Sequence, residues 1–170
     1  LVDHLYEEGV KLIVTDISED NINQVLKKYP DIQVVEPDNI YEVDCDIFSP
    51  NALGAVINDQ TIPKLTCFAI AGAANNVLAE ERHGTILHEK GILYAPDYVA
   101  NAGGLIQVAD ELHVFNKERA FKNASLIYDI LRKIFQISKQ QNIPTNLAAN
   151  HLVEEKIEKI ALIQKKFTGR

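Results

Sequence analysis

The sequence predicts an α/β fold in which a doubly wound parallel sheet is followed by C-terminal helices. Short apolar strands alternate with helical patterns over residues 1–115, the order expected of a parallel sheet with helices on both faces. The strand-like runs are apolar at successive positions, as in strands that are covered on both sides. From residue 102 onward only helical periodicity remains, so residues 116–170 are predicted to be helices that pack on the sheet domain.

The first part of the chain contains two predicted strands. The more apolar strand stops at an acid, Asp16, and Ser18 then has the place and the side chain of a helix N-cap. The predicted elements are a helix at residues 1–8 that ends at Gly9, a strand at 10–16, a helix at 19–28 that ends before Pro30, a strand at 32–35, and a turn or single helical turn at 37–41.

The rest of the chain contains three more predicted strands and then long helices. Pro144 separates the last two helices, because proline cannot continue a helix. The predicted elements are strands at residues 45–48, 67–71 and 92–95, a connector at 61–65, helical pieces between 76 and 90 that are broken near Gly84, and helices at 104–115, 117–141 and 146–167.

Composition and charge exclude several classes of protein. The 170 residues suffice for one well-packed domain, and the formal net charge of −7 argues against a nucleic-acid partner. No apolar run approaches the roughly 20 residues of a membrane-spanning helix, so no membrane partner is expected. Cys45 and Cys67 lie in separate strand-like runs and are expected to be reduced thiols of a cytoplasmic protein. The histidines lack the spacing of a metal site, and no metal is predicted.

Two of the predicted strands end in small residues together with an asparagine. The strand at residues 67–71 leads to Gly72 and Asn75, and the strand at 92–95 leads to Asn101. Small residues let a flat ligand lie against the backbone, and amide side chains both donate and accept hydrogen bonds. The pattern therefore suits a ring that bears a carboxamide. The alternative is a pair of ordinary strand-to-helix turns, in which glycine and asparagine are turn and cap residues.

The acid at the end of the first predicted strand indicates a nucleotide. In a sheet of this type such a carboxylate, here Asp16, can accept hydrogen bonds from both hydroxyls of an adenosine ribose. Ile17 and Ser18 follow it, with no arginine or lysine for a ribose phosphate, so NAD is predicted in preference to NADP. The alternative is a carboxylate that only caps the following helix.

The glycine-rich loop of a dinucleotide-binding site does not precede Asp16 in this sequence. That loop is expected about 20 residues before the acid. Leu1, however, already belongs to the helical pattern. We therefore predict a Rossmann-like doubly wound parallel sheet that lacks its first strand and glycine loop, and we expect both to lie upstream of Leu1.

Several motifs resemble those of a known enzyme family. They are I-A-G-A-A-N-N at residues 70–76, R-H-G at 82–84 and G-I-L-Y-A-P-D-Y-V-A-N-A-G-G-L-I-Q-V-A-D-E-L at 91–112. V-T-D-I at 14–17 and the segment 49–54 also look like the family, so the similarity spans essentially the whole chain. These motifs resemble the leucine/phenylalanine dehydrogenase group of the glutamate, leucine, phenylalanine and valine dehydrogenase family, with leucine dehydrogenases the nearest in pattern.

The resemblance implies oxidative deamination of an apolar L-amino acid with NAD to give the 2-oxo acid, ammonia and NADH. It also implies a homo-oligomer whose catalytic lysine and aspartate lie in a preceding substrate domain, so no catalytic residue is expected in this chain. The 170 residues alone are expected to bind NAD weakly and to deaminate no amino acid. The implied cofactor contacts are Asp16, Ile17, Asn51, Ala52, Ala71, Gly72, Ala73, Asn75 and Asn101, and the implied substrate contacts are Asn101, Ala124 and Ile127.

The choice of substrate follows from the helix at residues 117–141. By resemblance its substrate-facing positions are Ala124, Ile127 and Leu131, and these apolar side chains argue against a charged substrate such as glutamate. Leucine or another branched-chain amino acid is therefore predicted. The small Ala124 and residues 105–107 look more like the phenylalanine type, so phenylalanine and tryptophan remain alternatives.

Two other classes of protein compete with this prediction. A non-catalytic nucleotide-binding or regulatory module could keep the fold, but it would need its own first strand and glycine loop. A hydroxy-acid dehydrogenase would want a catalytic histidine where this sequence has Asn101.

Overall fold

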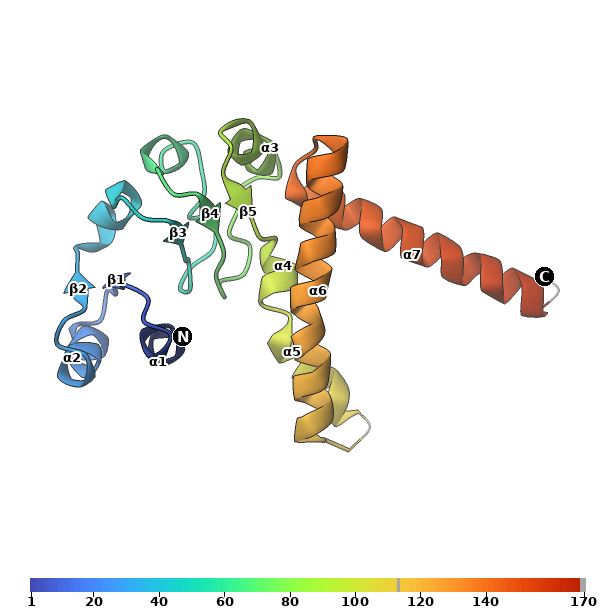
Figure 1. Ribbon diagram of the computed structural model, residues 1–170, viewed down its shortest axis with the longest axis horizontal. Helices are drawn as coiled ribbons and strands as arrows, with labels where there is room; N and C mark the ends of the chain where they lie inside the picture. The colour runs from blue at the N-terminus through green and yellow to red at the C-terminus, as the bar shows by residue number, and fades with distance from the viewer. Residues whose placement is uncertain (113, 169–170) are drawn as a thin grey trace. The chain divides into compact units, whose positions relative to one another are not determined.

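The chain divides into two compact units, and each is described by itself. The computed structural model describes residues 1–112 and 114–168, with side chains up to residue 162 (Figure 1). Unit 1 comprises Leu1–Asp44 and Lys64–Thr66, and unit 2 comprises Cys45–Pro63 and Cys67–Arg170. The sequence divides the chain between residues 115 and 116 into a cofactor-binding domain and C-terminal helices, and this division remains a prediction.

Unit 1 contains a parallel pair of short strands with helices beside them in the sequence. Its elements are α1 (Val2–Glu7), β1 (Ile13–Val14), α2 (Glu19–Lys28), β2 (Gln33–Val34) and the 3-10 helix η1 (Pro37–Glu42). The strands pair with Ile13 opposite Gln33. Helix α2 has the predicted bounds because Ser18 caps it, and the Ser18 Oγ accepts a hydrogen bond from Asn21 N at 3.4 Å.

Polar and aromatic contacts join α1 to the end of α2. The ring centroids of Tyr6 and Tyr29 lie 4.1 Å apart. The Asp3 carboxylate accepts hydrogen bonds from Lys28 Nζ at 2.8 Å and from Tyr29 Oη at 2.7 Å, and these contacts lower the pKa of Asp3. The Tyr6 hydroxyl donates to Asp31 at 2.8 Å. The two helices are therefore held together by directional contacts more than by a deep apolar core.

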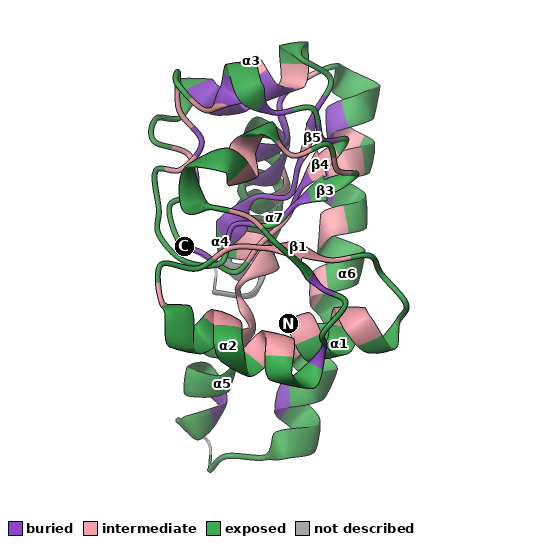
Figure 2. Ribbon diagram, turned by 90° about the vertical axis from the view of Figure 1, so that its left-hand side faces the viewer, coloured by how far each residue is buried: buried purple, intermediate pink, exposed green. Residues whose placement is uncertain are grey.

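Unit 2 is built on three parallel strands. β3 (Ile47–Phe48), β4 (Ala69–Ile70) and β5 (Leu93–Tyr94) lie side by side in the order β3-β4-β5. Buried residues concentrate on these strands and on α3 (Arg82–Glu89), where Ile70 and Leu87 are fully buried (Figure 2). Parallel strands with flanking helices confirm the predicted fold class. Ile47 and Phe68 are 60% and 68% exposed, so these strands are not covered on both sides over their whole length.

The segments that follow β3 and β4 run beside each other as one more parallel pair. Ile57 pairs with Leu78 in an isolated parallel bridge, and Ala55 N donates to Asn76 O at 2.7 Å. The prediction of helical structure from residue 76 onward is therefore wrong, because this segment forms hydrogen bonds with the neighbouring loop instead of with itself.

Helix α3 begins at Arg82 and continues through Gly84, so the predicted break at that glycine is also wrong. Gly84 is buried, and a Cβ at this position would lie 2.4 Å from Asn146 Oδ1. The glycine therefore permits close packing of α3 against the start of the last helix.

Four helices follow β5 and carry the C-terminal part of unit 2. They are α4 (Asp97–Ala100), α5 (Gly103–Glu111), α6 (Lys117–Gln141) and α7 (Thr145–Thr168). Helix α6 has the predicted bounds because Asn116 Oδ1 accepts from Arg119 N at its start and Asn142 adopts a left-handed φ of 54° at its end. Helix α5 is shorter than predicted, and residue 113, within the predicted helix, lies outside the described residues. The single turn α4 was not predicted.

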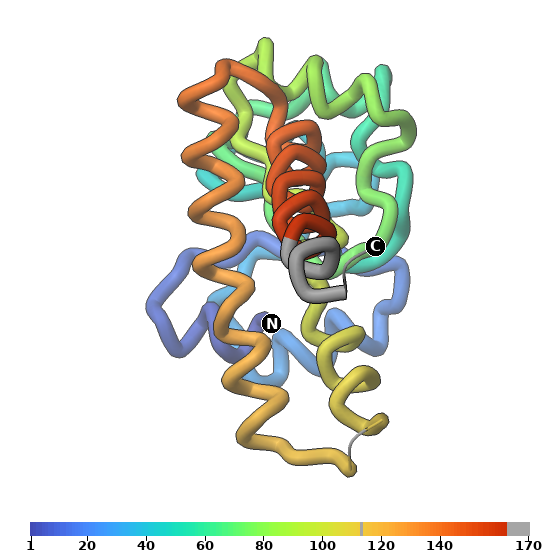
Figure 3. The backbone as a smooth tube through the Cα atoms, turned by 90° about the vertical axis from the view of Figure 1, so that its right-hand side faces the viewer, coloured from blue at the N-terminus to red at the C-terminus, as the bar shows by residue number. Residues whose placement is uncertain are grey.

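Helix α6 packs against α4, α5 and α7 (Figures 1 and 3). The centre of this packing is a cluster of Ile134, Ala148 and Ala149, with Val99 and Phe135 against it. Helix α7 also contacts α3 and β5. In the described part of the chain, no helix combines the length and the apolar character needed to cross a membrane.

Candidate functional site

The segments that follow β4 and β5 form a pocket lined by amide side chains, which we call the amide pocket. Its walls come from the turn after β4, from α4 and from the start of α5, and its volume is about 390 Å³. Ligands of open parallel sheets bind beyond the carboxyl ends of the strands, which is where this pocket lies. The lining residues are Asn75, Asn76, Asp97, Tyr98, Asn101, Ala102, Gly104 and Leu105.

The two asparagines that the sequence singled out meet in this pocket. Asn101 Nδ2 donates to Asn75 Oδ1 at 2.7 Å and to the carbonyl oxygen of Ala74 at 3.2 Å. Among the described residues, Asn75 Nδ2 and Asn101 Oδ1 have no hydrogen-bond partner. The pair therefore offers one donor and one acceptor to a ligand, which is the complement of a primary carboxamide.

A buried carboxylate that sequence reasoning missed lies behind the asparagines. Asp97 is 8% exposed, and it accepts hydrogen bonds from Val77 N at 3.1 Å and from the Tyr94 hydroxyl at 2.9 Å. Burial raises the pKa of Tyr94 well above its ordinary value of 10.0, so the phenol stays protonated and keeps donating. The only available sequence signal was an acid directly after the Ala-Pro that ends β5.

The small residues after β4 bring two loops of the protein together. A Cβ at Gly72 would lie 2.0 Å from the carbonyl oxygen of Pro50, so only glycine fits. Ala74 N also donates to Pro50 O at 3.1 Å. Gly72 therefore lets the loop after β3 lie close to the backbone of the turn after β4.

The remaining predicted cofactor residues of unit 2 lie on the same two loops. Asn51 is exposed, and its Oδ1 accepts from Ala73 N at 3.0 Å. Ala52 is exposed next to it. Ala71 is half-buried, and its N–H donates to Phe48 O at 3.1 Å in the ladder between β3 and β4. These residues lie at one edge of the sheet, as predicted, whereas their contact with a cofactor remains a prediction.

Asp16 lies in unit 1, in the turn between β1 and α2. Its Oδ1 accepts from Ser18 N at 2.8 Å and its Oδ2 from Asn21 Nδ2 at 3.1 Å. The bond from Ser18 is the larger of these two contacts in lowering the pKa of Asp16. The carboxylate is thus a capping group, and because each oxygen can accept a second hydrogen bond, it can still bind hydroxyls. The neighbouring Ile17 is 91% exposed.

A second and larger pocket of unit 2 lies among α4, α5, α6 and α7, and we call it the apolar pocket. Its volume is about 720 Å³, and aliphatic side chains form most of its wall. It shares Tyr98 and Ala102 with the amide pocket. Of the three predicted substrate positions on α6, Ile127 lines it, whereas Ala124 and Leu131 are half-buried positions outside the described lining.

An ion pair between a buried carboxylate and a half-exposed arginine lies in the wall of the apolar pocket. The carboxylate of Asp110, with 3% of its side chain exposed, accepts hydrogen bonds from Arg119 Nε and, at 2.6 Å, from Asn116 N. Sequence reasoning missed this group, although its spacing from Ile106 placed it on an apolar helix face. The charge is paired within the protein, so the pocket keeps its apolar character.

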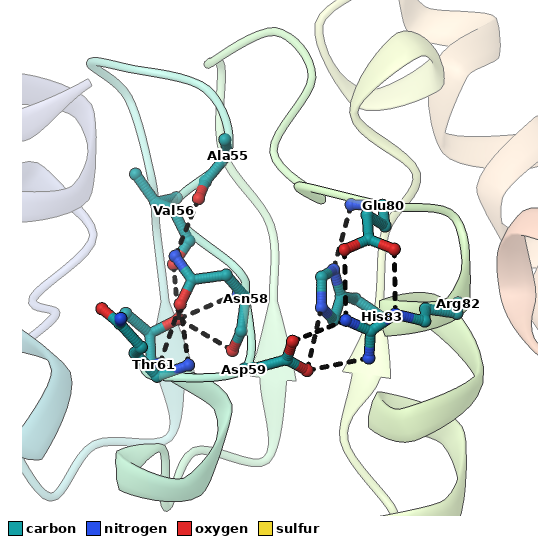
Figure 4. A network of polar contacts seen from close by, with 9 residues as sticks. Ala55, Val56, Asn58, Asp59, Thr61, Glu80, Arg82 and His83 are labelled. Carbon is teal, nitrogen blue, oxygen red and sulfur yellow. Dashed lines mark hydrogen bonds and ion pairs between the residues drawn. The ribbon is translucent and has the colours of Figure 1, made fainter.

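A polar network joins the loop after β3 to the start of α3 (Figure 4). Arg82 binds Asp59 through Nη2 at 2.5 Å and Glu80 through Nε at 2.9 Å. The buried His83 accepts from Glu80 N through Nδ1 at 3.0 Å, so its Nε2 carries the proton and faces Asp59 Oδ1 at 3.3 Å.

Asp59, Glu80 and His83 are also the described residues whose ligand atoms lie close enough to hold a metal ion. A cation there would have to displace Arg82 and take the proton from His83 Nε2. The geometry therefore fits an ion-pair network that fastens two loops, and it fits a metal site poorly.

Residues 7–165 match the family model described as Glutamate/Leucine/Phenylalanine/Valine dehydrogenase. The chain belongs to the glutamate/leucine/phenylalanine/valine dehydrogenase family. The resemblance seen in the sequence motifs is thereby confirmed.

The chain has relatives that are dehydrogenases named for several different amino acids. It is 56% identical over 158 residues to leucine dehydrogenase of Thermoactinomyces intermedius, covering 93% of this chain and 43% of that protein. It is 46% identical over 168 residues to phenylalanine dehydrogenase of Caldalkalibacillus thermarum, covering 96% of this chain and 45% of that protein. The chain therefore spans somewhat under half the length of these relatives.

Solved structures of the family show the same fold. L-Tryptophan dehydrogenase from Nostoc punctiforme superposes with a TM-score of 0.91 at 48% identity, covering 94% of this chain and 48% of that chain. The hetero-hexameric glutamate dehydrogenase from Thermus thermophilus superposes with a TM-score of 0.61 at 14% identity, covering 82% of this chain and 36% of that chain, and it supports the fold alone. The Rossmann-like α/β fold is thus confirmed.

Proposed function

We propose that the chain is the cofactor-binding part of an NAD-dependent amino-acid dehydrogenase. The proposed reaction is oxidative deamination of an apolar L-amino acid, with leucine or another branched-chain amino acid as the substrate, to the 2-oxo acid and ammonia. The observation that carries the proposal is the paired amide of Asn75 and Asn101, which lies beside a pocket of aliphatic side chains. Membership of the family supports it.

The residues present fit a nicotinamide dinucleotide. When bound, NAD supplies an acceptor for the hydride that leaves the substrate α-carbon. Asn75 Nδ2 and Asn101 Oδ1 would hold its carboxamide and so select one face of the ring, because both are without a partner among the described residues. Asp16 would accept hydrogen bonds from the adenosine ribose, and the exposed Ile17 would lie beside the adenine.

The apolar pocket would hold the substrate side chain. Ile127 contributes to its wall, and the paired charges of Asp110 and Arg119 leave no free acid or base for a charged substrate. Asn101 would lie between cofactor and substrate. We also propose that Ala124 faces the substrate when the preceding domain is present, and that residues 1–115 bind the cofactor while 116–170 support them.

The preceding domain would supply the catalytic lysine and aspartate, since the two carboxylates that line the described pockets, Asp97 and Asp110, already accept hydrogen bonds within the protein. We place the complete enzyme in the cytoplasm as a homo-oligomer.

Phenylalanine or tryptophan is the second candidate substrate. The observation in its favour is the size of the apolar pocket, about 720 Å³, which exceeds what a branched aliphatic side chain fills. The 48% identical L-tryptophan dehydrogenase supports this alternative.

The test is an assay of the complete protein with leucine, valine, phenylalanine, tryptophan and glutamate, each with NAD and with NADP. NADH formation is expected with the aliphatic amino acids, with lower activity on aromatic ones and none on glutamate. The isolated 170 residues serve as the control and are expected to form no NADH. NAD binding without turnover of any amino acid would instead indicate a non-catalytic nucleotide-binding module.

A further inference from the structure

One residue holds both of the turns that carry the paired amides. Asp97 is the first residue of α4, three residues after the end of β5. Its carboxylate accepts from Val77 N at 3.1 Å, two residues beyond Asn75. Its own carbonyl oxygen accepts from Asn101 N at 2.8 Å. The side chain and the main chain of Asp97 therefore link the turn of Asn75 to the turn of Asn101.

We propose that Asp97 is a positioning residue that sets the relative orientation of Asn75 and Asn101. Asp97 lines the amide pocket, but in this proposal it makes no contact with the reacting atoms. It acts through the two amides, and its effect on catalysis rests on the proposed dehydrogenase function.

The chemistry of the site requires an acceptor with two free oxygens. Val77 N–H and the Tyr94 hydroxyl both point at the carboxylate, one at each oxygen. The Tyr94 oxygen in turn accepts from Asp97 N at 3.2 Å, which fixes the phenol in one orientation. An asparagine at position 97 has one acceptor oxygen in place of two, so the Val77 N–H and the Tyr94 hydroxyl can no longer both donate to it. A Val77 N–H that faces the NH2 group would be a buried donor without an acceptor, which is costly.

The turn of Asn75 is also attached on its other side, to the loop after β3. Asn76 O accepts from Ala55 N at 2.7 Å, and Val77 O accepts from Ile57 N at 3.0 Å. Loss of the Asp97 contact would leave this attachment in place. The expected result is therefore a separation of Asn75 from Asn101 in a chain that still folds.

The structural test is side-chain amide NMR on the full 170-residue chain. In the wild type, a nuclear Overhauser contact is expected between the Asn101 NH2 group and residues Ala74 and Asn75. Asp97→Asn is expected to abolish this contact and to speed hydrogen exchange of Val77 N–H. Tyr94→Phe is the matched variant, because it removes the other partner of the same carboxylate but keeps the Val77 contact, and it is expected to retain the amide pair.

Two results would overturn the proposal in this test. One is an unchanged contact between Asn75 and Asn101 in Asp97→Asn. The other is an equal loss in both variants, because the Val77 contact would then not be the decisive one. If Asp97→Asn fails to fold, Asp97→Glu is measured in its place. It moves the carboxylate by one methylene and should weaken the same NMR contact between the two amides.

The catalytic test uses the complete enzyme at a temperature where all variants are folded. Asp97→Asn is expected to lower kcat by about 100-fold, since a misplacement of about 1 Å can have that effect, with KM for the amino acid little changed. The primary isotope effect with α-deuterated substrate is expected to rise. A merely structural role would lower the melting temperature and leave kcat of the folded enzyme unchanged. If the wild type deaminates no amino acid, the proposed function fails while the NMR result still decides the role of Asp97.

Discussion

The amide pocket and the apolar pocket share Tyr98 and Ala102 as wall residues, yet they are built in different ways. A turn, the short helix α4 and the start of α5 form the amide pocket, and directional hydrogen bonds hold the turn to α4. Four helices, the long α6 and α7 among them, form the apolar pocket, and aliphatic side chains pack its wall. Asn101 depends on contacts at 2.7 and 3.2 Å, whereas Ile127 depends only on its size and shape.

This difference indicates what each pocket can control. Hydrogen bonds lose their value when an atom moves by a fraction of an ångström, so the amide pocket suits a ligand that must be oriented for reaction. Apolar contacts are not directional, and their contribution follows the area that is buried. The apolar pocket therefore suits discrimination by size. Substitutions should have larger effects on rate in the first pocket and smaller effects, mostly on preference, in the second.

The largest effect is expected from Asn101→Ala in the complete enzyme. Loss of one amide that orients the reacting groups should lower kcat/KM by about 2–4 kcal/mol, or roughly 30- to 1,000-fold. Steady-state kinetics with leucine and NAD measure the change. Asn150→Ala, at an exposed position of α7, is the control and should leave kcat/KM unchanged. An unchanged kcat/KM for Asn101→Ala would mean that Asn101 is only a turn residue.

Gly72→Ala should lower stability because an added Cβ would lie 2.0 Å from Pro50 O. A backbone shift to relieve such a clash costs about 1–3 kcal/mol of unfolding free energy. Urea unfolding of the chain measures it. Gly103→Ala is the control, since nothing lies within 4 Å of its added Cβ. Equal stability of the two variants would mean that the loops of the amide pocket are less tightly fixed than the structure indicates.

Ile127→Ala should alter preference more than rate. Removing wall atoms from the apolar pocket should lower kcat/KM for leucine by about 1–3 kcal/mol and affect phenylalanine less, because the larger side chain fills the added space. The ratio of kcat/KM for the two substrates is the measurement. Phe121→Leu, 67% exposed on the same helix and outside the lining, should leave that ratio as it is. A parallel fall for both substrates would contradict a role in size selection.

The smallest effect is expected from Arg82→Gln, which removes the centre of the network in Figure 4. Arg82 lowers the pKa of Asp59 and of Glu80 below their ordinary values of 3.8 and 4.5. A lowered pKa stabilises the folded state above the ordinary value, and this stabilisation is lost as the pH falls through the lowered pKa. The melting temperatures of wild type and variant should therefore differ near neutral pH, begin to converge as the pH falls below about 4, and meet only below the lowered pKa values of the two carboxyl groups.

The control for the acid dependence is Arg132→Gln, because Arg132 lies over the ring of Tyr128 and is not part of the network. The difference in melting temperature between Arg132→Gln and the wild type should not change with pH. If the difference in melting temperature between Arg82→Gln and the wild type is the same across the acid range, the exposed ion pairs contribute nothing measurable to stability.

Local signals in the sequence were enough to predict several elements to the residue. Helix α2 starts after the cap Ser18, and α6 is bounded by Asn116 and the left-handed Asn142. The strand ends that carry Asn75 and Asn101 were also predicted, because a strand followed by small residues is visible in a short window. These features depend on neighbours in the chain.

The features that were missed depend on partners far away in the sequence. Residues 76–81 were predicted as helix because nothing local indicates that they pair with 55–57. The role of Asp97 depends on Val77, 20 residues away, and the burial of Asp110 depends on how α6 packs. Helix α4 was missed because a single turn has no periodicity.

Tyr98 connects the two pockets in a way that matters for directed evolution. Tyr98 lines both pockets, so under the proposed function a mutation there made to admit a bulkier amino acid would also alter the surface that faces the coenzyme. Improvements found at this position would therefore be epistatic with changes on either side. Libraries aimed at new substrates would be easier to combine if they diversified α6 around Ile127 and kept the tyrosine constant.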